Sequence, residues 1–395
     1  MKLSNVHIAG HDGLHHIEFA NGRISRIESV NSMPPEPRDP SISANEYQLS
    51  LNEAIAFPGL INSHDHLDFD LFPRYGSRIY PSYTEWGSDI HQTNKINIAG
   101  VLKIPQPLRI RWGIYKNLLN GITTVVHHGA KLKIKEDLIS VCQKVPSYHS
   151  ISGEKRWRLK LVNPFRRRWP LAIHIGEGTS PASSAEIGEL IKWNIFNREL
   201  IGIHGIAMNE KQASSFHALV WCPDSNLFLY NKTAAIDRIR HHTRIVFGTD
   251  STLTASWNLW EHLRLARDQH LVTDTELWDM LTRSPAELWG LEDCGKIEVG
   301  QWADLTVASP PAHTKGWDAV YGLNPENILL VLHKGNIRLF DGSLYDQLAR
   351  ASFPLNDFHK IQVRGITKYI QGDLPGLMNE IRKIHPSVEF PVEQG

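Results

Sequence analysis

The spacing of apolar and polar positions changes twice along the 395 residues of the chain. The first part contains three short alternating runs: Lys2–Ala9, Leu14–Phe19 and Arg23–Ile27. The last two are joined at Asn21-Gly22, and Asn-Gly is a strong signal for a two-residue hairpin turn. The pattern therefore predicts a small β unit here, followed by a proline-rich loop at 31–40 and a further strand at 49–57.

From about residue 58 onward, short apolar runs alternate with stretches of helical periodicity, which is typical of βαβ units. The apolar runs are rich in β-branched residues, as expected of parallel strands buried on both faces. Expected strands are 54–64, 123–128, 147–151, 171–175, 200–204, 218–222 and 244–249. Expected helices are 109–119, 136–144, 184–196, 210–216 and 257–268. A closed (β/α)8 barrel needs eight strands. We therefore predict an α/β fold with a TIM barrel of this type that is distorted or lacks one βα unit.

After Glu292 the pattern returns to short strands, at 295–308, 328–334 and 337–340, with a second Gly-Asn turn at 335–336. These short strands and their Gly-Asn turn resemble the strands and the Asn-Gly turn of the N-terminal part. We therefore expect one composite β-sandwich domain built from both chain ends. The predicted division is 1–57 with 292–345 for this domain, 58–291 for the barrel and 346–395 for a C-terminal helical extension.

Composition excludes several classes of protein. The 42 basic and 42 acidic residues cancel, which argues against a nucleic-acid binder that depends on a global positive field. The sequence contains no run of 18 or more apolar residues, so we expect no membrane-spanning helix. The N-terminal residues are too polar for a signal peptide. The three cysteines are far apart and form no disulfide framework, so we expect a cytoplasmic protein.

Histidine is the unusual entry in the composition, with 21 residues. His64 and His66 form a His-x-His pair at the end of the first predicted barrel strand. Side chains two positions apart on a strand share a face, and the carboxyl end of a barrel strand opens on the mouth where active sites lie. The pair can hold one metal ion; the alternative is two polar residues in a strand-ending turn.

Three later strands also end in a polar group. His174 ends one strand, with Glu177 three residues further on, while His204 and Asp250 end two others. Such groups are costly next to buried strands unless they are paired or bind a ligand. In a barrel all of these strand ends converge on one mouth, which favours a shared metal site.

At this point the sequence resembles the amidohydrolase superfamily, in particular its branch of cytosine and guanine deaminases and chlorohydrolases. The matching motifs are PGLINSHDHL (58–67), GITTV (121–125), IHIGE (173–177), GIHG (202–205), CPDSNL (222–227), FGTDS (247–251), TRSPAELWGL (282–291) and GKIEVGQWADL (295–305). They occur in the family's order and cover roughly residues 1–340.

The resemblance implies one divalent metal per chain, held by His64, His66, His174 and Asp250. Three imidazoles and a carboxylate suit zinc, with iron and manganese as alternatives. The resemblance also implies that Glu177 shuttles a proton, that His204 polarises the substrate or holds the water, and that Asp250 accepts a proton from that water. No lysine ends a convincing fourth strand, which favours one metal rather than two.

Three features depart from the family pattern. Only about 45 residues separate GITTV from IHIGE, so the fourth βα unit is expected to be trimmed or missing. Additional histidines end the second and third strands, and we expect them to line the substrate pocket or to be structural: His127, His128 and His149. The long loop after the metal pair supplies weaker candidates for substrate contact, namely Arg74, Tyr83 and Trp86.

The run Lys155–Trp169 carries seven basic residues and three aromatic ones. Such a run can bind nucleic acid. We instead expect a solvated crossover helix whose aromatic side chains pack on the barrel.

Together these features predict a metal-dependent hydrolase acting on carbon–nitrogen bonds other than peptide bonds. The favoured reaction is hydrolytic deamination of an aminated heterocycle. The alternatives are ring-opening hydrolysis of a cyclic amide, as in imidazolonepropionase-like relatives, and a non-catalytic scaffold of the same fold. The expected partner is a small-molecule substrate, without nucleic acid or membrane, and a homodimer is the default assembly.

Overall fold

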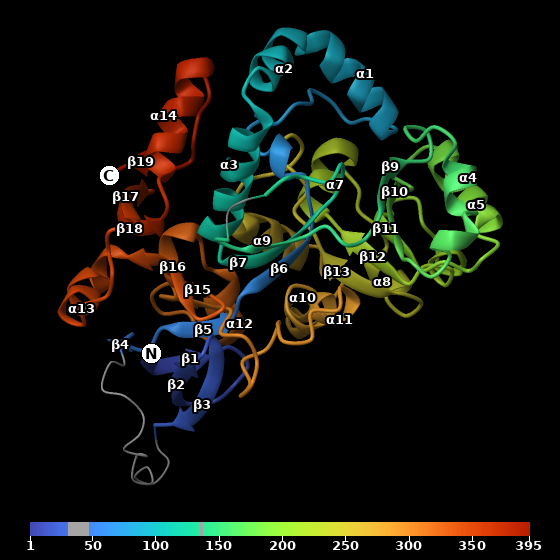
Figure 1. Ribbon diagram of the computed structural model, residues 1–395. Helices are drawn as coiled ribbons and strands as arrows, with labels where there is room; N and C mark the ends of the chain where they lie inside the picture. The colour runs from blue at the N-terminus through green and yellow to red at the C-terminus, as the bar shows by residue number, and fades with distance from the viewer. Residues whose placement is uncertain (31–46, 135–136) are drawn as a thin grey trace.

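The computed structural model describes residues 1–30, 47–134 and 137–395. The proline-rich loop expected at 31–40 lies outside these ranges. Two parallel sheets form the centre of the molecule (Figure 1). One contains β6 (Leu60–Asp65), β7 (Ile122–His127) and β8 (Ser140–Cys142). The other contains β9 (Ser147–Ser150), β10 (Leu171–Ile175), β11 (Leu200–His204), β12 (Ala218–Trp221) and β13 (Arg244–Phe247).

Strands β8 and β9 together fill a single position of the barrel. β8 pairs with Thr124–Val126 of β7, and Ser147 at the start of β9 exchanges hydrogen bonds with the backbone of Gly129, just beyond β7. β9 then pairs with β10. Only residues 143–146 separate the two strands, whereas a parallel crossover needs a dozen or more residues. The barrel therefore has seven strand positions, one of them bent.

This arrangement corrects one sequence-based expectation. The described part of 136–144, expected to be helical, contains β8 instead. Val141 and Cys142 pair with Val125 and Val126, so the register with β7 overrides the helical spacing. No helix occurs in the described part of 128–146, so the trimmed βα unit lacks its crossover helix.

The opposite seam, between β13 and β6, is closed by backbone groups. The N–H groups of Thr249 and Asp250 both donate to the carbonyl of His64, at 3.1 and 3.0 Å. Gly248 lies between these strands, and a Cβ added there would be 2.7 Å from the Cβ of His64. The close approach of the two strands thus places His64 and Asp250 side by side.

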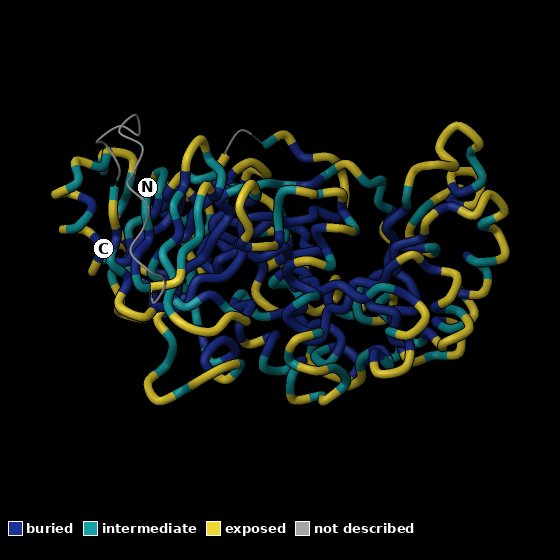
Figure 2. Tube along the Cα trace, turned by 90° about the horizontal axis from the view of Figure 1, so that it is seen from below, coloured by how far each residue is buried: buried dark blue, intermediate teal, exposed yellow. Residues whose placement is uncertain are grey.

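Helices surround the sheets. Those that follow barrel strands are α5 (Pro181–Trp193), α6 (Glu210–Ala213), α7 (Pro223–Tyr230), α8 (Ile236–Ile239), α9 (Leu259–Asp268), α10 (Asp274–Asp279) and α11 (Arg283–Leu288). The largest core cluster lies between these helices and β10–β13. Figure 2 shows the buried segments along the middle of the molecule and exposed loops at its rim. Within the described ranges, each helix is too short or too polar to span a bilayer.

The segment between β6 and β7 lies over the barrel mouth. It contains α1 (Tyr83–Thr93) and α2 (Lys95–Leu102) before α3 (Gln106–Leu119) returns to β7 (Figure 1). Ser82 forms an antiparallel bridge with Gly178, after β10. Tyr80 donates its N–H to the carbonyl of Leu229 in α7. The segment is thereby fixed to two neighbouring loops of the mouth.

Both chain ends form one mixed sheet, in which all eleven described strands outside the barrel are paired. Its N-terminal strands are β1 (Lys2–Ile8), β2 (Leu14–Ala20), β3 (Arg23–Ser29), β4 (Gln48–Ser50) and β5 (Ile55–Pro58). Its C-terminal strands are β14 (Leu305–Ala308), β15 (Ile328–His333), β16 (Asn336–Asp341), β17 (Phe358–Val363), β18 (Ile366–Gln371) and β19 (Glu393–Gln394). β5 joins the two groups because it pairs with both β1 and β14.

The segment 346–395 is therefore not a helical extension. Besides α13 (Tyr345–Arg350) and α14 (Leu374–Ile384), it contains the hairpin β17–β18. The hairpin turns at Arg364 and Gly365, both with positive φ, and its buried positions alternate as expected for a strand. β18 also pairs with β16, which makes this segment part of the composite sheet.

Candidate functional site

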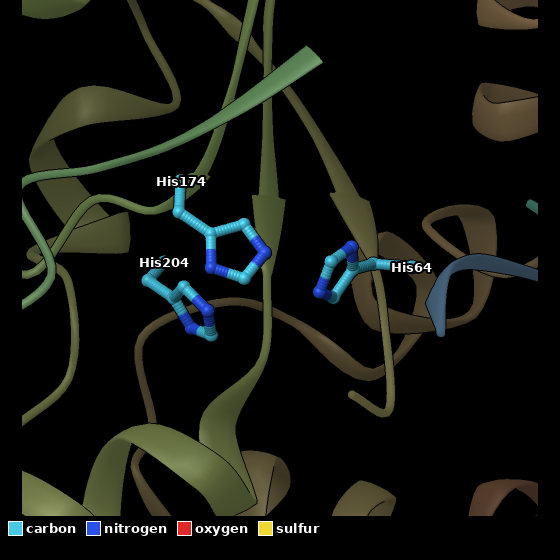
Figure 3. A group of neighbouring side chains, drawn as sticks. All are labelled: His64, His174 and His204. Carbon is cyan, nitrogen blue, oxygen red and sulfur yellow. The ribbon is translucent and has the colours of Figure 1, made fainter. Parts of the chain in front are cut away.

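Three strand ends bring His64, His174 and His204 together, with their imidazoles facing one another (Figure 3). The ring centroids lie 4.9 Å apart for His64 and His174, 4.9 Å for His174 and His204, and 5.9 Å for His64 and His204. All three side chains are buried. This spacing allows one ligand atom from each residue to reach a common ion.

A second group shares His64 and adds His66 and Asp250. Oδ1 of Asp250 lies 3.7 Å from Nε2 of His64 and 3.8 Å from Nε2 of His66. The rings of His66 and His174 are 5.5 Å apart. The two groups thus share His64: His174 and His204 complete one of them, and His66 and Asp250 complete the other.

The charge state of the histidines suits a metal site. Burial, and next the neighbouring imidazoles, hold the pKa of His64 and of His174 well below the ordinary value. Neutral imidazole offers the lone pair that a metal needs. The Nε2 atoms of His64, His174 and His204 are buried and have no hydrogen-bond partner among the described residues. A buried acceptor left unsatisfied costs about 1–3 kcal/mol, so a divalent ion fits these orphaned atoms.

The tautomer of His204 is set by a neighbour. Nδ1 of His204 lies 2.9 Å from Oδ1 of Asn226, and the amide nitrogen of Asn226 donates to Thr233. The amide oxygen is therefore the acceptor, Nδ1 carries a proton, and Nε2 is the atom that faces the site. Asn226 belongs to the CPDSNL motif in α7.

Asp250 is oriented by two hydroxyl groups. Ser225 and Thr254 each donate to its Oδ2 at 2.9 Å, which leaves Oδ1 facing the imidazoles. Burial alone would raise the pKa of Asp250, but electrostatic attraction, from His66 first and from His204 next, holds it below the ordinary value. Both Asp250 and His204 adopt positive φ, 58° and 71°. Such strain in residues other than glycine is typical of functional sites.

Glu177 lies on the other side of the histidines. Its Oε2 is 3.3 Å from Nδ1 of His174 and 3.7 Å from Nε2 of His204. Its Oε1 accepts a hydrogen bond of 3.0 Å from the hydroxyl of Tyr230. The carboxyl group is thereby buried, directed toward the imidazoles and fixed at both oxygens.

A buried ionic network around Asp65 supports the strand end that carries His64 and His66. Asp65, between the two histidines, accepts hydrogen bonds from Lys116 at 2.9 Å and from Asn117 at 2.8 Å, both on α3. Lys116 also donates to Asp70 at 2.7 Å. Asn62 connects Asp65 to Thr249 after β13. The network ties β6, α3 and the end of β13 into one support for the site.

Two of the three extra histidines join the cluster. The ring of His128 is 4.6 Å from His174 and 5.0 Å from His64, and its Nε2 contacts the carbonyl of Tyr148. The ring of His149 is 5.2 Å from His174. His127 instead contacts the carbonyl of Ala130 and has no ring contact with the cluster among the described residues.

The loop candidates also differ in position. Tyr83 lies beside the site, because its ring is 6.1 Å from His149, its hydroxyl donates to Ser150 and its N–H donates to the carbonyl of Glu177. Arg74 pairs with Asp224 and stacks on Phe228. The indole of Trp86 donates to the carbonyl of Tyr75. Neither Arg74 nor Trp86 shows a contact with the histidine cluster in the described part of the chain.

Sequence reasoning missed several groups of this site. Tyr230 and Lys116 carry no local signal, because only the packing of α7 and α3 brings them to Glu177 and Asp65. Ser225 and Asn226 did have a signal, since both stand in the CPDSNL motif at the start of α7.

Comparisons with known proteins support the family resemblance and the fold. The model of the amidohydrolase family matches residues 167–338. The fold is similar to an adenosine deaminase from Xanthomonas campestris with bound zinc, with a TM-score of 0.65, 16% identity, and coverage of 89% of this chain and 96% of that chain. It is also similar to atrazine chlorohydrolase from Arthrobacter aurescens TC1 complexed with zinc, with a TM-score of 0.64, 16% identity, and coverage of 89% and 99%.

A third similar structure is guanine deaminase from C. acetobutylicum with bound guanine, with a TM-score of 0.63, 13% identity, and coverage of 85% of this chain and 99% of that chain. No curated protein sequence matches the chain. At these identities the solved structures establish the shared α/β fold, and the site must be argued from its own residues.

Proposed function

We propose that this chain, in which residues 167–338 match the model of the amidohydrolase family, is a metal-dependent hydrolase that deaminates an aminated heterocycle. One observation carries the proposal. Buried, neutral imidazoles with unsatisfied Nε2 atoms surround a point that a fixed carboxylate, Asp250, and a second carboxyl group, Glu177, also face.

We assign His64, His66, His174 and Asp250 as the residues that would hold the metal ion. Zinc is the expected ion, because imidazole and carboxylate ligands suit it, and zinc is present in two of the similar structures. Iron or manganese would suit the same donors. When bound, the ion would supply Lewis acidity and activate water near neutral pH.

Glu177 is proposed to carry the proton. Its carboxyl group lies against His174 and His204, so a proton taken from water can be delivered to a leaving nitrogen on the same side. Tyr230 holds one carboxyl oxygen in place. General acid–base catalysis of this kind contributes about 10²–10⁴-fold to a rate.

The remaining side chains serve the substrate in this proposal. His204, held at Nδ1 by Asn226, would polarise the atom next to the reacting carbon or help to hold the attacking water. Asp250 would accept a proton from the attacking water. His128, His149 and Tyr83 would line the pocket above.

Deamination is favoured because two of the similar structures are deaminases of purine compounds. Their substrates and that of the chlorohydrolase share an electron-poor ring carbon bearing a leaving group. A carboxyl group placed to protonate a leaving nitrogen is the feature that this chain contributes to the same chemistry.

A screen of zinc-loaded protein tests the proposal. Aminated purines, pyrimidines and triazines, their chlorinated counterparts and cyclic amides are incubated separately, with release of ammonia, chloride and ring-opened acid measured for each. Ammonia from an aminated ring supports deamination. Chloride release or ring opening without ammonia contradicts it, and protein that folds but takes up no divalent metal contradicts the metal assignment.

A further inference from the structure

The exposed Phe and Trp side chains of the described residues gather in one region. Every Phe or Trp exposed among the described residues lies there: Phe165, Trp169, Trp193 and Phe196. Leu159 and Ile195 add two exposed aliphatic side chains. We call these six residues and the cations around them the basic–aromatic patch. Soluble monomers rarely expose such a concentration of apolar surface unless it binds something.

The patch spans two neighbouring elements at one edge of the barrel. Figure 1 shows α4 (Trp157–Leu161) beside α5, to the right of the sheets. Arg158 of α4 pairs with Glu189 of α5 and lies over the ring of Trp193. Arg198, two residues after Phe196, donates to the carbonyl of Trp169, so the segments that carry the six residues are neighbours.

The same surface is strongly cationic. Residues 151–170 contain seven basic residues and one acidic residue, Glu154, a net charge of +6. Arg158 and Lys160 pair with Glu189 and Glu154. For the other five, no ion pair is found within the described ranges: Lys155, Arg156, Arg166, Arg167 and Arg168. Because the whole chain has a net charge of zero, this positive field is local.

The backbone beneath the patch is fixed. Trp157 and Leu161, one turn apart on α4, are buried in the barrel core. The buried guanidinium of Arg198 donates to the carbonyls of Lys160 and Trp169, at 3.3 and 3.1 Å. The segment is thus held at both ends, and Phe165, which is 93% exposed, stands on the η2 turn (Pro164–Arg166) between them.

We propose that the basic–aromatic patch docks this protein on an anionic lipid surface. Lys and Arg side chains are attracted to anionic headgroups, while Phe, Trp and Leu insert at the boundary with the acyl chains. This departs from the sequence-based expectation of no membrane partner. The expected crossover helix is present as α4, and Trp157 packs on the barrel, but Phe165 and Trp169 face solvent instead.

Two other partners fit the surface less well. A second copy of the chain joined by two-fold symmetry would place these unpaired cations against their own equivalents, which repel. A single-stranded nucleic acid would stack on aromatic rings and pair with the cations, but it would gain little from Leu159 and Ile195, which are exposed in the same patch.

Vesicle sedimentation with the full-length protein tests the proposal. We expect binding to vesicles of phosphatidylcholine with phosphatidylserine, weak binding to phosphatidylcholine alone, and loss of binding at high salt. The triple variant Arg166→Gln, Arg167→Gln, Arg168→Gln should lower the partition coefficient roughly tenfold or more. The double variant Phe165→Ser, Trp169→Ser should also lower it.

Matched control variants are available elsewhere on the surface. Lys95→Gln, Lys103→Gln, Lys232→Gln removes three exposed cations outside the patch, and Ile96→Ser removes an apolar side chain that is 86% exposed. These controls should keep wild-type binding. A wild type that ignores anionic vesicles, or a control triple variant that weakens binding equally, would overturn the proposal.

An oligonucleotide arm separates the remaining possibility. If wild-type protein binds single-stranded DNA tightly but does not bind anionic vesicles, the patch binds a nucleic acid and the membrane proposal is wrong. The binding readouts do not depend on turnover, so they are independent of the proposed hydrolase activity.

Discussion

Glu177 is buried and contacts two imidazoles and one phenol. This environment suits the proposed role of Glu177 in proton transfer. We expect Glu177→Gln to retain the fold and the bound metal but to lower kcat about 10²–10⁴-fold, because the amide cannot carry a proton. Metal content by elemental analysis and ammonia release measure the two effects. Glu210→Gln, at an exposed position, is the control. Full activity of Glu177→Gln would place the shuttle elsewhere.

Tyr230 positions the carboxyl group of Glu177 through a hydrogen bond to Oε1, and it has no direct role in the proposed reaction. Removing its hydroxyl frees Oε1 of Glu177, so Tyr230→Phe should lower kcat roughly tenfold and leave KM nearly unchanged. The control is Tyr321→Phe, which also loses a buried hydroxyl hydrogen bond, to the carbonyl of Asp274, far along the chain in α12 (Gly316–Tyr321). Equal kinetic losses in the two variants would show a general effect on stability instead of positioning.

At the scale of elements, the contact between β13 and β6 sets the distance between His64 and Asp250, two of the proposed metal ligands. A Cβ at Gly248 would lie 2.7 Å from that of His64 and 2.8 Å from Val220, so Gly248→Ala must push the strands apart. We expect a loss of about 1–3 kcal/mol in the free energy of unfolding together with weaker metal binding. In contrast, Gly188→Ala in α5, where an added Cβ meets nothing within 4 Å, should be neutral or stabilising. Metal titration and urea unfolding of both variants decide this.

The elements that sequence could predict are those with a local signal. The barrel strands near His174, His204 and Asp250 combine an apolar run with a polar group. In the structure β10 ends one residue after His174, β11 ends at His204, and Asp250 follows β13 by three residues. The pairing of β8 with β7 has no such mark, because its register is decided by the neighbouring strand. The hairpin β17–β18 did have alternation and a turn at Arg364-Gly365, which the charged residues around it obscured.

The same limit applies to the site. The proposed metal ligands are predictable because each lies at or near the carboxyl end of a strand and the topology gathers these ends at one mouth. Tyr230, Lys116 and Asp70 are distant in sequence from the groups they contact, so only the packing of α7 and α3 reveals them. Whether an aromatic residue faces core or solvent also depends on packing, as Trp157 and Phe165 show within one segment.

At the scale of the whole molecule, buried ion pairs in two separate places contribute to stability in addition to the apolar core. Lys116 lies between Asp65 and Asp70 beneath the barrel mouth, and Lys368 pairs with Asp341 in the composite sheet. Breaking such a pair from one side typically costs about 3–5 kcal/mol. Both networks join a strand to another element, so they connect the barrel and the chain ends to the elements packed on them.

Glu186 of α5 makes global stability depend on pH. Burial raises its pKa from 4.5 to about 7 against the opposing hydrogen bond from the N–H of Gly176, with a further raising contribution from Glu177. Between these pH values the folded state holds a proton that the unfolded state has released, so this contribution to stability is present at pH 5 and lost as the pH rises through 7. Glu186→Gln should therefore be more stable than wild type at pH 8, by up to about 3 kcal/mol, and equal to it near pH 5. Urea midpoints at both pH values measure the difference, and the exposed Glu199→Gln should follow wild type throughout. A Glu186→Gln variant that tracks wild type at pH 8 would show that this carboxyl group titrates at its ordinary pKa.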